Sequence, residues 1–166
     1  MITKLALATG CSMLPSSSPA KIEGKLPVNK DEKKAVTLTR KEVTDILASE
    51  NKDFSGLDMR KANLVKLDFS DCKMVEANLS YANLKECNFT NCDLKGASLW
   101  NANLESTIFN NANLEDADLD YAKLRGAILY KANIRRATLP TDLIPREDIM
   151  SSVQNGTKIG TIKHHH

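Results

Sequence analysis

Residues 77–86 read ANLSYANLKE and residues 112–127 read ANLEDADLDYAKLRGA, and both stretches carry an apolar leucine at every fifth position, with smaller residues between. A large apolar side chain holds this spacing for eighteen consecutive repeats, from Phe54 to Leu139. An α-helix turns about 500° in five residues, so these side chains would be spread around its circumference. In a flat strand, an odd period would send successive side chains to opposite faces. The chain must therefore turn a corner once in each repeat.

The repeat A(N/D)LXX, sustained over residues 52–139, resembles the pentapeptide-repeat family. The resemblance implies an all-β solenoid, a right-handed quadrilateral parallel β-helix in which four repeats form one square coil. It also implies that the central apolar residue and the small residue two places before it point inward. Eighteen repeats would then form about 4.5 coils, roughly 22 Å tall at the spacing of paired strands.

The phenylalanines provide an independent test of the square coil. Phe69, Phe89 and Phe109 are spaced by 20 residues. Four-sided coils would stack them in one column, whereas three-sided coils of 15 residues would scatter them over different walls. We therefore expect a phenylalanine column on one wall of the solenoid.

The segments next to the repeats are expected to cover its two ends, because a solenoid leaves its terminal layers open. Residues 37–51 carry the signature of an N-terminal capping helix, with Thr39 as N-cap and Glu42 three residues later. Residues 140–163 are expected to form a C-terminal cap or tail. A second short helix is a candidate there, beginning at Pro145, because proline and acidic residues suit a first turn.

Residues 1–36 are rich in Pro, Ser and Lys and are expected to form a disordered, leader-like tail. Their start, MITKLALATGC, resembles the end of a bacterial lipoprotein signal, with Cys11 as the lipidated residue. The apolar run is shorter than such a signal needs. We therefore favour the cytoplasm, with the periplasm or thylakoid lumen, reached by a truncated leader, as the alternative. Residues 164–166 are interpreted as a tag remnant.

Composition and charge exclude several functional classes. The net charge is +2, and residues 52–139 carry twelve Lys/Arg and twelve Asp/Glu, so the repeats lack the basic surface of a nucleic-acid binder. No histidine precedes residue 164, no CxxC occurs, and a filled square core offers no cleft. We therefore predict no enzyme activity, no cofactor, no small-molecule substrate and no metal site.

Three cysteines, Cys72, Cys87 and Cys92, occupy the inward small position of their repeats. Cys72 and Cys92 are 20 residues apart, which places their Cα atoms about 4.8 Å apart, inside the range of a disulfide. We favour structural thiols that pack as small apolar groups. An oxidised Cys72–Cys92 pair across neighbouring coils is the alternative.

The strongest surface signal is aromatic. On the 20-residue register, Tyr81, Trp100 and Tyr121 lie on one face in three consecutive coils. Exposed Trp and Tyr are enriched at binding hot spots, so these residues form a candidate partner-binding patch. The alternative is that they shield the backbone of the corner from water.

These observations favour a non-enzymatic protein-interaction or scaffold module that presents a rigid prism to an unknown protein partner. The layout resembles small bacterial members of the family that are abundant in cyanobacteria. One alternative is a DNA mimic that interacts with a topoisomerase (gyrase), as in the fluoroquinolone-resistance branch, but the neutral repeats count against it. Another is an exported or lipid-anchored protein of the envelope or lumen.

Overall fold

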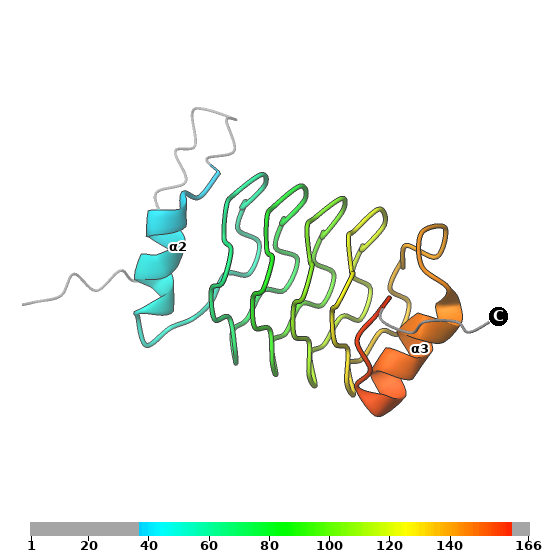
Figure 1. The fold of residues 1–166 in the computed structure, drawn as a ribbon. Coiled ribbons are helices and arrows are strands. Elements are labelled where there is room, and N and C mark those ends of the chain that lie inside the picture. The colour runs from blue at the N-terminus through cyan, green and yellow to red at the C-terminus, as the bar shows by residue number, and fades with distance from the viewer. Residues whose placement is uncertain (1–36, 161–166) are drawn as a thin grey trace, which may run out of the picture. The chain divides into compact units, whose positions relative to one another are not determined.

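The computed structural model describes residues 37–160. Two helices, α2 (Arg40–Leu47) and α3 (Arg146–Asn155), flank a stack of coils (Figure 1). Neither helix of this described part is long and apolar enough to cross a membrane. The predicted tail with Cys11 and the tag residues lie outside the described residues.

Each coil pairs with the next one through residues that are 20 positions apart. Parallel bridges join Asp53 to Lys73 and Lys73 to Asp93, and equivalent bridges continue along the stack. Beside each bridge, the N–H of the central residue donates to the following coil, as from Phe54 to the Lys73 carbonyl at 2.7 Å. The 20-residue period of a four-sided coil is therefore present in the backbone pairing.

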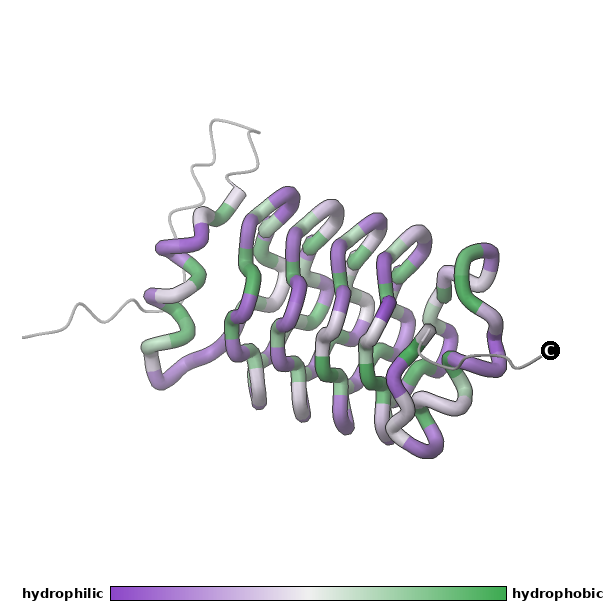
Figure 2. Tube along the Cα trace, in the orientation of Figure 1, coloured by the Kyte–Doolittle hydropathy of each residue, from purple (hydrophilic) through white to green (hydrophobic). Residues whose placement is uncertain are grey.

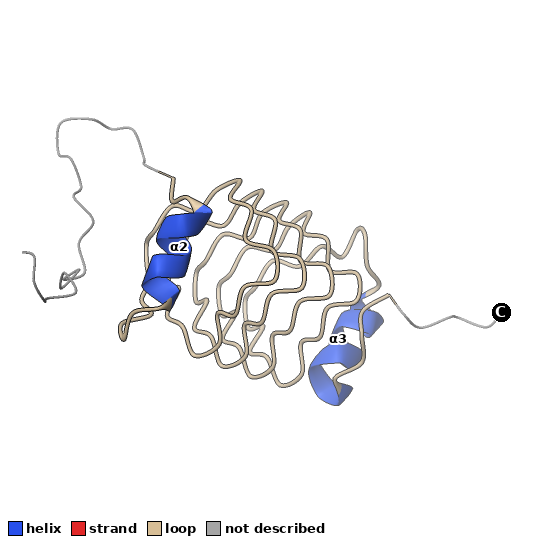
Figure 3. Ribbon diagram, turned by 60° about the vertical axis from the view of Figure 1, so that its left-hand side comes forward, coloured by secondary structure: helices blue, strands red, loops and turns tan. Residues whose placement is uncertain are grey.

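The expectation of an all-β fold needs one correction, because residues 37–160 contain isolated bridges and no continuous strand (Figure 3). A β-turn follows each bridge residue from Asp53 to Asn133, closed for example by a 3.1 Å hydrogen bond from the Leu57 N–H to the Phe54 carbonyl. The third residue of each turn has a positive φ, from 51° at Asn101 to 76° at Gly126. Because corners recur every five residues, each wall is too short for a strand.

The interior of the stack is a continuous apolar core. Hydrophobic and hydrophilic positions alternate along every coil (Figure 2). Phe69, Phe89 and Phe109 are fully buried and stack with ring centroids 5.2 and 5.1 Å apart, as the 20-residue spacing predicts. The small inward positions from residue 72 to residue 132 hold mostly alanine and are buried as well.

Helix α2 lies against the first coil. Its N-terminus has a complete capping box between Thr39 and Glu42, and its Val43 side chain is fully buried in the core. Ile46 and Leu47 pack partly buried against the same core. The helix therefore covers the apolar residues that the first coil would otherwise leave in water.

Helix α3 and the residues after it occupy the position of a further coil. The N–H of Lys131 donates to the Val153 carbonyl at 2.8 Å, and the N–H of Gly126 donates to the Ile159 carbonyl at 2.7 Å. Pro145 precedes the helix, and Gly156, with φ of 70°, ends it. These contacts satisfy backbone donors that the last coil would leave unpaired.

Candidate protein-interaction surface

Three aromatic side chains form a continuous ladder on one corner of the solenoid. The ring centroids of Tyr81 and Trp100 lie 4.9 Å apart with an interplanar angle of 79°. Those of Trp100 and Tyr121 lie 5.7 Å apart at 73°. The sequence placed these residues on one face, and the structure brings their rings into direct edge-to-face contact. We call this set the aromatic ladder.

The turns of three neighbouring coils position the ladder. Trp100 is the second residue of its turn, whereas Tyr81 and Tyr121 are third residues, with φ of 61° and 57°. The N–H of Tyr81 donates to the Trp100 carbonyl at 2.9 Å, which ties the two turns together. A bulky side chain in the left-handed region is uncommon. The fold thus holds both tyrosines on a backbone that glycine or asparagine would adopt more easily.

The aromatic ladder is open to solvent. Tyr81 is 47% exposed and Tyr121 is 52% exposed, while Trp100 between them is half-buried. Asn101 lies in the same column as the two tyrosines and is exposed. Asp120 precedes Tyr121 and accepts a hydrogen bond from its N–H at 3.1 Å. The corner therefore combines aromatic surface with an amide and a carboxylate.

Charged residues on two other corners pair from coil to coil. Lys66 reaches Glu86 at 3.5 Å, and Lys85 reaches Glu105 at 3.4 Å. The closest such pair is Arg136 with Asp116, at 2.6 Å. Hydrogen bonds from Arg136 hold the pKa of the Asp116 carboxyl below its usual value. Acidic and basic side chains therefore neutralise one another along these corners.

The three predicted structural cysteines are buried free thiols. Burial raises the pKa of Cys72 and Cys87 to about 11. Burial raises the pKa of Cys92 still further, with the neighbouring Cys72 adding to the effect. These thiols lack the lowered pKa and the exposure that a reactive cysteine needs.

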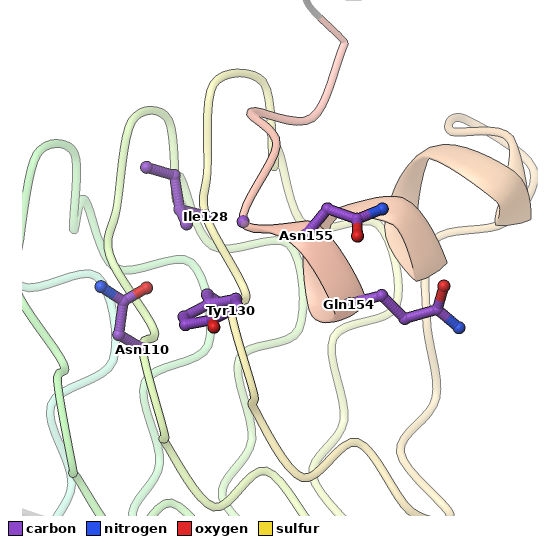
Figure 4. Close-up of a pocket in the computed structure, with 6 residues that line it drawn as sticks. Asn110, Ile128, Tyr130, Gln154 and Asn155 are labelled. Carbon is purple, nitrogen blue, oxygen red and sulfur yellow. The ribbon is translucent and has the colours of Figure 1, made fainter.

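The sequence did not predict an open hollow of about 480 Å³ at the C-terminal end of the solenoid (Figure 4). It is lined by Asn110, Ile128, Tyr130, Gln154, Asn155 and Gly156. In an earlier coil, Asn88 accepts a hydrogen bond from the N–H of Thr90 at 3.1 Å. Ile108 replaces that asparagine in the next coil and offers no side-chain acceptor. The buried Asn110 Oδ1 is itself an acceptor and has no hydrogen-bond partner among the described residues. The sequence feature that marks this region is the pair Ile108 and Ile128, which stand where most repeats have Asn or Asp.

Residues 37–160 contain no group of three or more His, Cys, Asp or Glu side chains that could hold a metal ion. The acidic stretch 115–120 is divided by the fold, because Ala117 and Leu119 point into the core. Asp116 is engaged by Arg136, as described above. Nothing in the described residues points to a catalytic centre.

Comparisons with known proteins identify the repeats. The profile described as "Pentapeptide repeat region" matches residues 49–119, and that described as "Pentapeptide repeats (8 copies)" matches residues 107–140. The chain matches no curated protein sequence.

Several solved structures are similar to this chain. A pentapeptide repeat protein of the Arabidopsis thaliana thylakoid lumen is 28% identical over 54% of this chain and 55% of its own, with a TM-score of 0.44. A pentapeptide repeat protein from the cyanobacterium Nostoc is 25% identical over 61% of this chain and 75% of its own, with a TM-score of 0.39. QnrB1, a plasmid-mediated fluoroquinolone resistance protein, is 18% identical over 53% of this chain and 56% of its own, with a TM-score of 0.38.

The chain spans about half the length of the Arabidopsis protein (55%). Pentapeptide repeat proteins are right-handed quadrilateral β-helices, and the 20-residue parallel pairing of the coils agrees with that architecture. The two profiles together match residues 49–140. The chain belongs to the pentapeptide repeat family.

Proposed function

We propose that this protein is a non-enzymatic protein-interaction module and that the aromatic ladder is its contact surface. The observation that carries the proposal is the exposure of Tyr81 and Tyr121, which are 47% and 52% exposed on either side of Trp100. Exposed aromatic side chains that pack against one another lose little conformational entropy on binding, and Trp and Tyr dominate binding hot spots. A rigid prism of about 4.5 coils would hold them in place without reorganisation.

Retention of a partner by immobilised protein tests the proposal. The Trp100→Ala/Tyr121→Ala double variant is expected to lose a partner that the wild type retains from an extract. Tyr130→Ala is the matched control, because Tyr130 is an exposed tyrosine (36%) on a different corner. Far-UV circular dichroism establishes that all three proteins are folded. Equal retention by the double variant and the wild type would overturn the proposal.

The alternative of a gyrase-interacting DNA mimic is less well supported. Such a mimic needs an uninterrupted acidic row, because DNA carries one negative charge for about every 1.7 Å of its axis. Here basic and acidic side chains alternate along the corners, in the pairs Lys66–Glu86, Lys85–Glu105 and Arg136–Asp116. A gyrase supercoiling assay with added protein tests this alternative, and strong inhibition would favour it over our proposal.

We propose the cytoplasm as the compartment, with export to a periplasm or thylakoid lumen, or lipid attachment at Cys11, as the alternative. Fractionation of cells that express the complete gene, with Cys11→Ser as the control, separates the two. Membrane association that depends on Cys11 would favour the lipid-anchored protein.

A further inference from the structure

The spacing of the aromatic ladder selects the conformation of a ligand that follows the solenoid axis. Tyr81 and Tyr121 occupy the same position of their repeats, two coils apart. At about 4.8 Å per coil, the two positions are about 9.6 Å apart along the axis. A regular ligand would have to present equivalent side chains at this interval to contact both tyrosines in the same way.

Among the regular peptide conformations, polyproline II has this interval. It has three residues per turn and rises about 3.1 Å per residue, so equivalent side chains recur about every 9.3 Å. An α-helix repeats about every 5.4 Å along its axis. Alternate side chains of a β-strand recur after about 6.7 Å. A polyproline II segment can therefore place one residue at Tyr81 and the residue three positions along at Tyr121.

The residues between the two tyrosines suit the same ligand. Asn101 lies midway between Tyr81 and Tyr121, is exposed, and has no side-chain hydrogen bond in the described part of the protein. Its amide can donate to a ligand carbonyl, and polyproline II leaves its carbonyls without internal hydrogen bonds. Trp100 supplies apolar surface beside it, and aromatic surfaces are the usual docking sites for proline-rich segments.

Charge distinguishes the two ends of the ladder. Asp118 and Asp120 lie at the Tyr121 end, and neither carboxylate has an ion-pair partner among residues 37–160. Asp116, on another corner, is by contrast held by Arg136. Lys61 lies in the tyrosine column beyond Tyr81. A basic ligand residue is therefore attracted to the Tyr121 end and repelled from the Tyr81 end.

A glycan fits the ladder less well. Sugar rings stack on aromatic faces, which requires faces that lie open in one plane. The Trp100 ring is inclined at 79° to Tyr81 and at 73° to Tyr121. A flat chain of sugars would meet an edge at every second ring.

We propose that the aromatic ladder binds a proline-rich segment of a partner protein in the polyproline II conformation. The segment runs along the solenoid axis and places a lysine or arginine next to Asp118 and Asp120. This inference rests on the proposed function, because it names the class of partner for the same surface. Its evidence is the two-coil spacing of the tyrosines, the Asn101 amide, which has no side-chain hydrogen bond among residues 37–160, and the carboxylates at one end, which have no ion-pair partner there.

Intrinsic fluorescence of the full-length protein provides the test, because Trp100 is the sole tryptophan of the chain. The probe is a peptide of nine prolines followed by arginine, and the control peptide has glycine and serine in place of the prolines. We expect a saturable shift of the Trp100 emission with a Kd below about 1 mM for the proline peptide, and no such shift for the control peptide. Tyr121→Ala should weaken the binding at least about ten-fold, and Asp120→Asn should weaken it too, because it removes one of the carboxylates that attract the arginine. Tyr130→Ala should leave it unchanged.

An equal response to both peptides would overturn the inference, as would unchanged affinity in folded Tyr121→Ala. Binding of cellohexaose without binding of the proline peptide would also overturn it, in favour of a glycan. If the peptide fails to bind while the Trp100→Ala/Tyr121→Ala protein loses its partner, this inference fails and the proposed function stands. If partner retention is unaffected by the double variant, the proposed function itself fails.

Discussion

The phenyl rings of Phe69 and Phe89 are nearly parallel, with centroids 5.2 Å apart and an interplanar angle of 7°. Both side chains are fully buried, and Phe109 continues the column on the other side of Phe89. Each ring therefore packs against the coil before it and the coil after it. Removing the middle ring takes contacts from both neighbours.

Phe89→Ala is expected to lower the free energy of unfolding by about 3–5 kcal/mol, because it leaves a cavity in a core that cannot collapse from one coil to the next. Phe89→Leu should lower the free energy of unfolding clearly less, since leucine keeps most of the side-chain volume. Urea unfolding followed by circular dichroism measures both. A loss below about 1 kcal/mol for the alanine variant would show that the column contributes little.

Local regularity explains why much of this fold was predictable. The five-residue period specifies the inward positions, and the 20-residue recurrence of phenylalanine identifies one wall, without any knowledge of distant contacts. The capping box of Thr39 and Glu42 is likewise a pattern of four adjacent residues. The absence of continuous strands in the described repeats follows from the turn that closes every five residues, which side-chain periodicity alone does not describe.

The candidate site was predictable only in part. The register placed Tyr81, Trp100 and Tyr121 on one face, but their ring contact depends on turn geometry. The hollow beside Asn110 was missed, because it forms where α3 folds back on the solenoid. The pairing of Arg136 with Asp116 in the preceding coil was not predicted, because it depends on which side chains the coils bring together.

Gly126→Ala tests the left-handed corners. Gly126 has φ of 76°, and an added Cβ would lie 3.0 Å from the Ser106 Oγ. We expect the free energy of unfolding to fall by about 1–2 kcal/mol because of the backbone conformation, and by a further amount because of the contact with Ser106. Gly56→Ala is the matched control, because its φ is 69° and nothing lies within 4 Å of the added atom. Equal losses in thermal or urea unfolding would mean that the Ser106 contact costs nothing.

The pair of Asp116 and Arg136 predicts a defined pH dependence. Hydrogen bonding to Arg136 lowers the pKa of Asp116 in the folded protein below its usual 3.8. The stabilisation of the folded protein by this pair is therefore complete at a pH above the usual pKa of Asp116. It is lost as the pH falls through the lower pKa that Asp116 has in the folded protein. The difference in Tm between wild type and Asp116→Asn should be constant from pH 7 to about 5 and should shrink below about 4. A difference that grows on acidification would contradict this assignment.

Thiol reactivity tests the burial of the three core cysteines. In the Cys11→Ser variant, any signal with Ellman's reagent comes from Cys72, Cys87 and Cys92. At pH 8, thiols with a pKa of about 11 are ionised on the order of one part in a thousand. We expect almost no reaction in the native protein and three equivalents after denaturation. One equivalent would instead indicate an oxidised Cys72–Cys92 pair, and rapid native reaction would indicate an open core.

Helix α2 is predicted to protect the first coil through the side chain of Arg40. Its guanidinium donates from Nη1 to the Asn63 carbonyl and from Nη2 to the Val65 carbonyl, both at 3.0 Å. Arg40→Ala removes both donors, and hydrogen exchange of the amides in residues 54–67 should become several-fold faster. Because each coil of a solenoid is stabilised mainly by its neighbours, exchange in residues 109–120 should stay unchanged. Arg40→Lys should fall between the two, since one ammonium lacks the planar fork that reaches both carbonyls. Uniform acceleration of exchange along the chain would show that α2 stabilises the whole solenoid. No acceleration would show that the two hydrogen bonds of Arg40 do not hold α2 on the first coil.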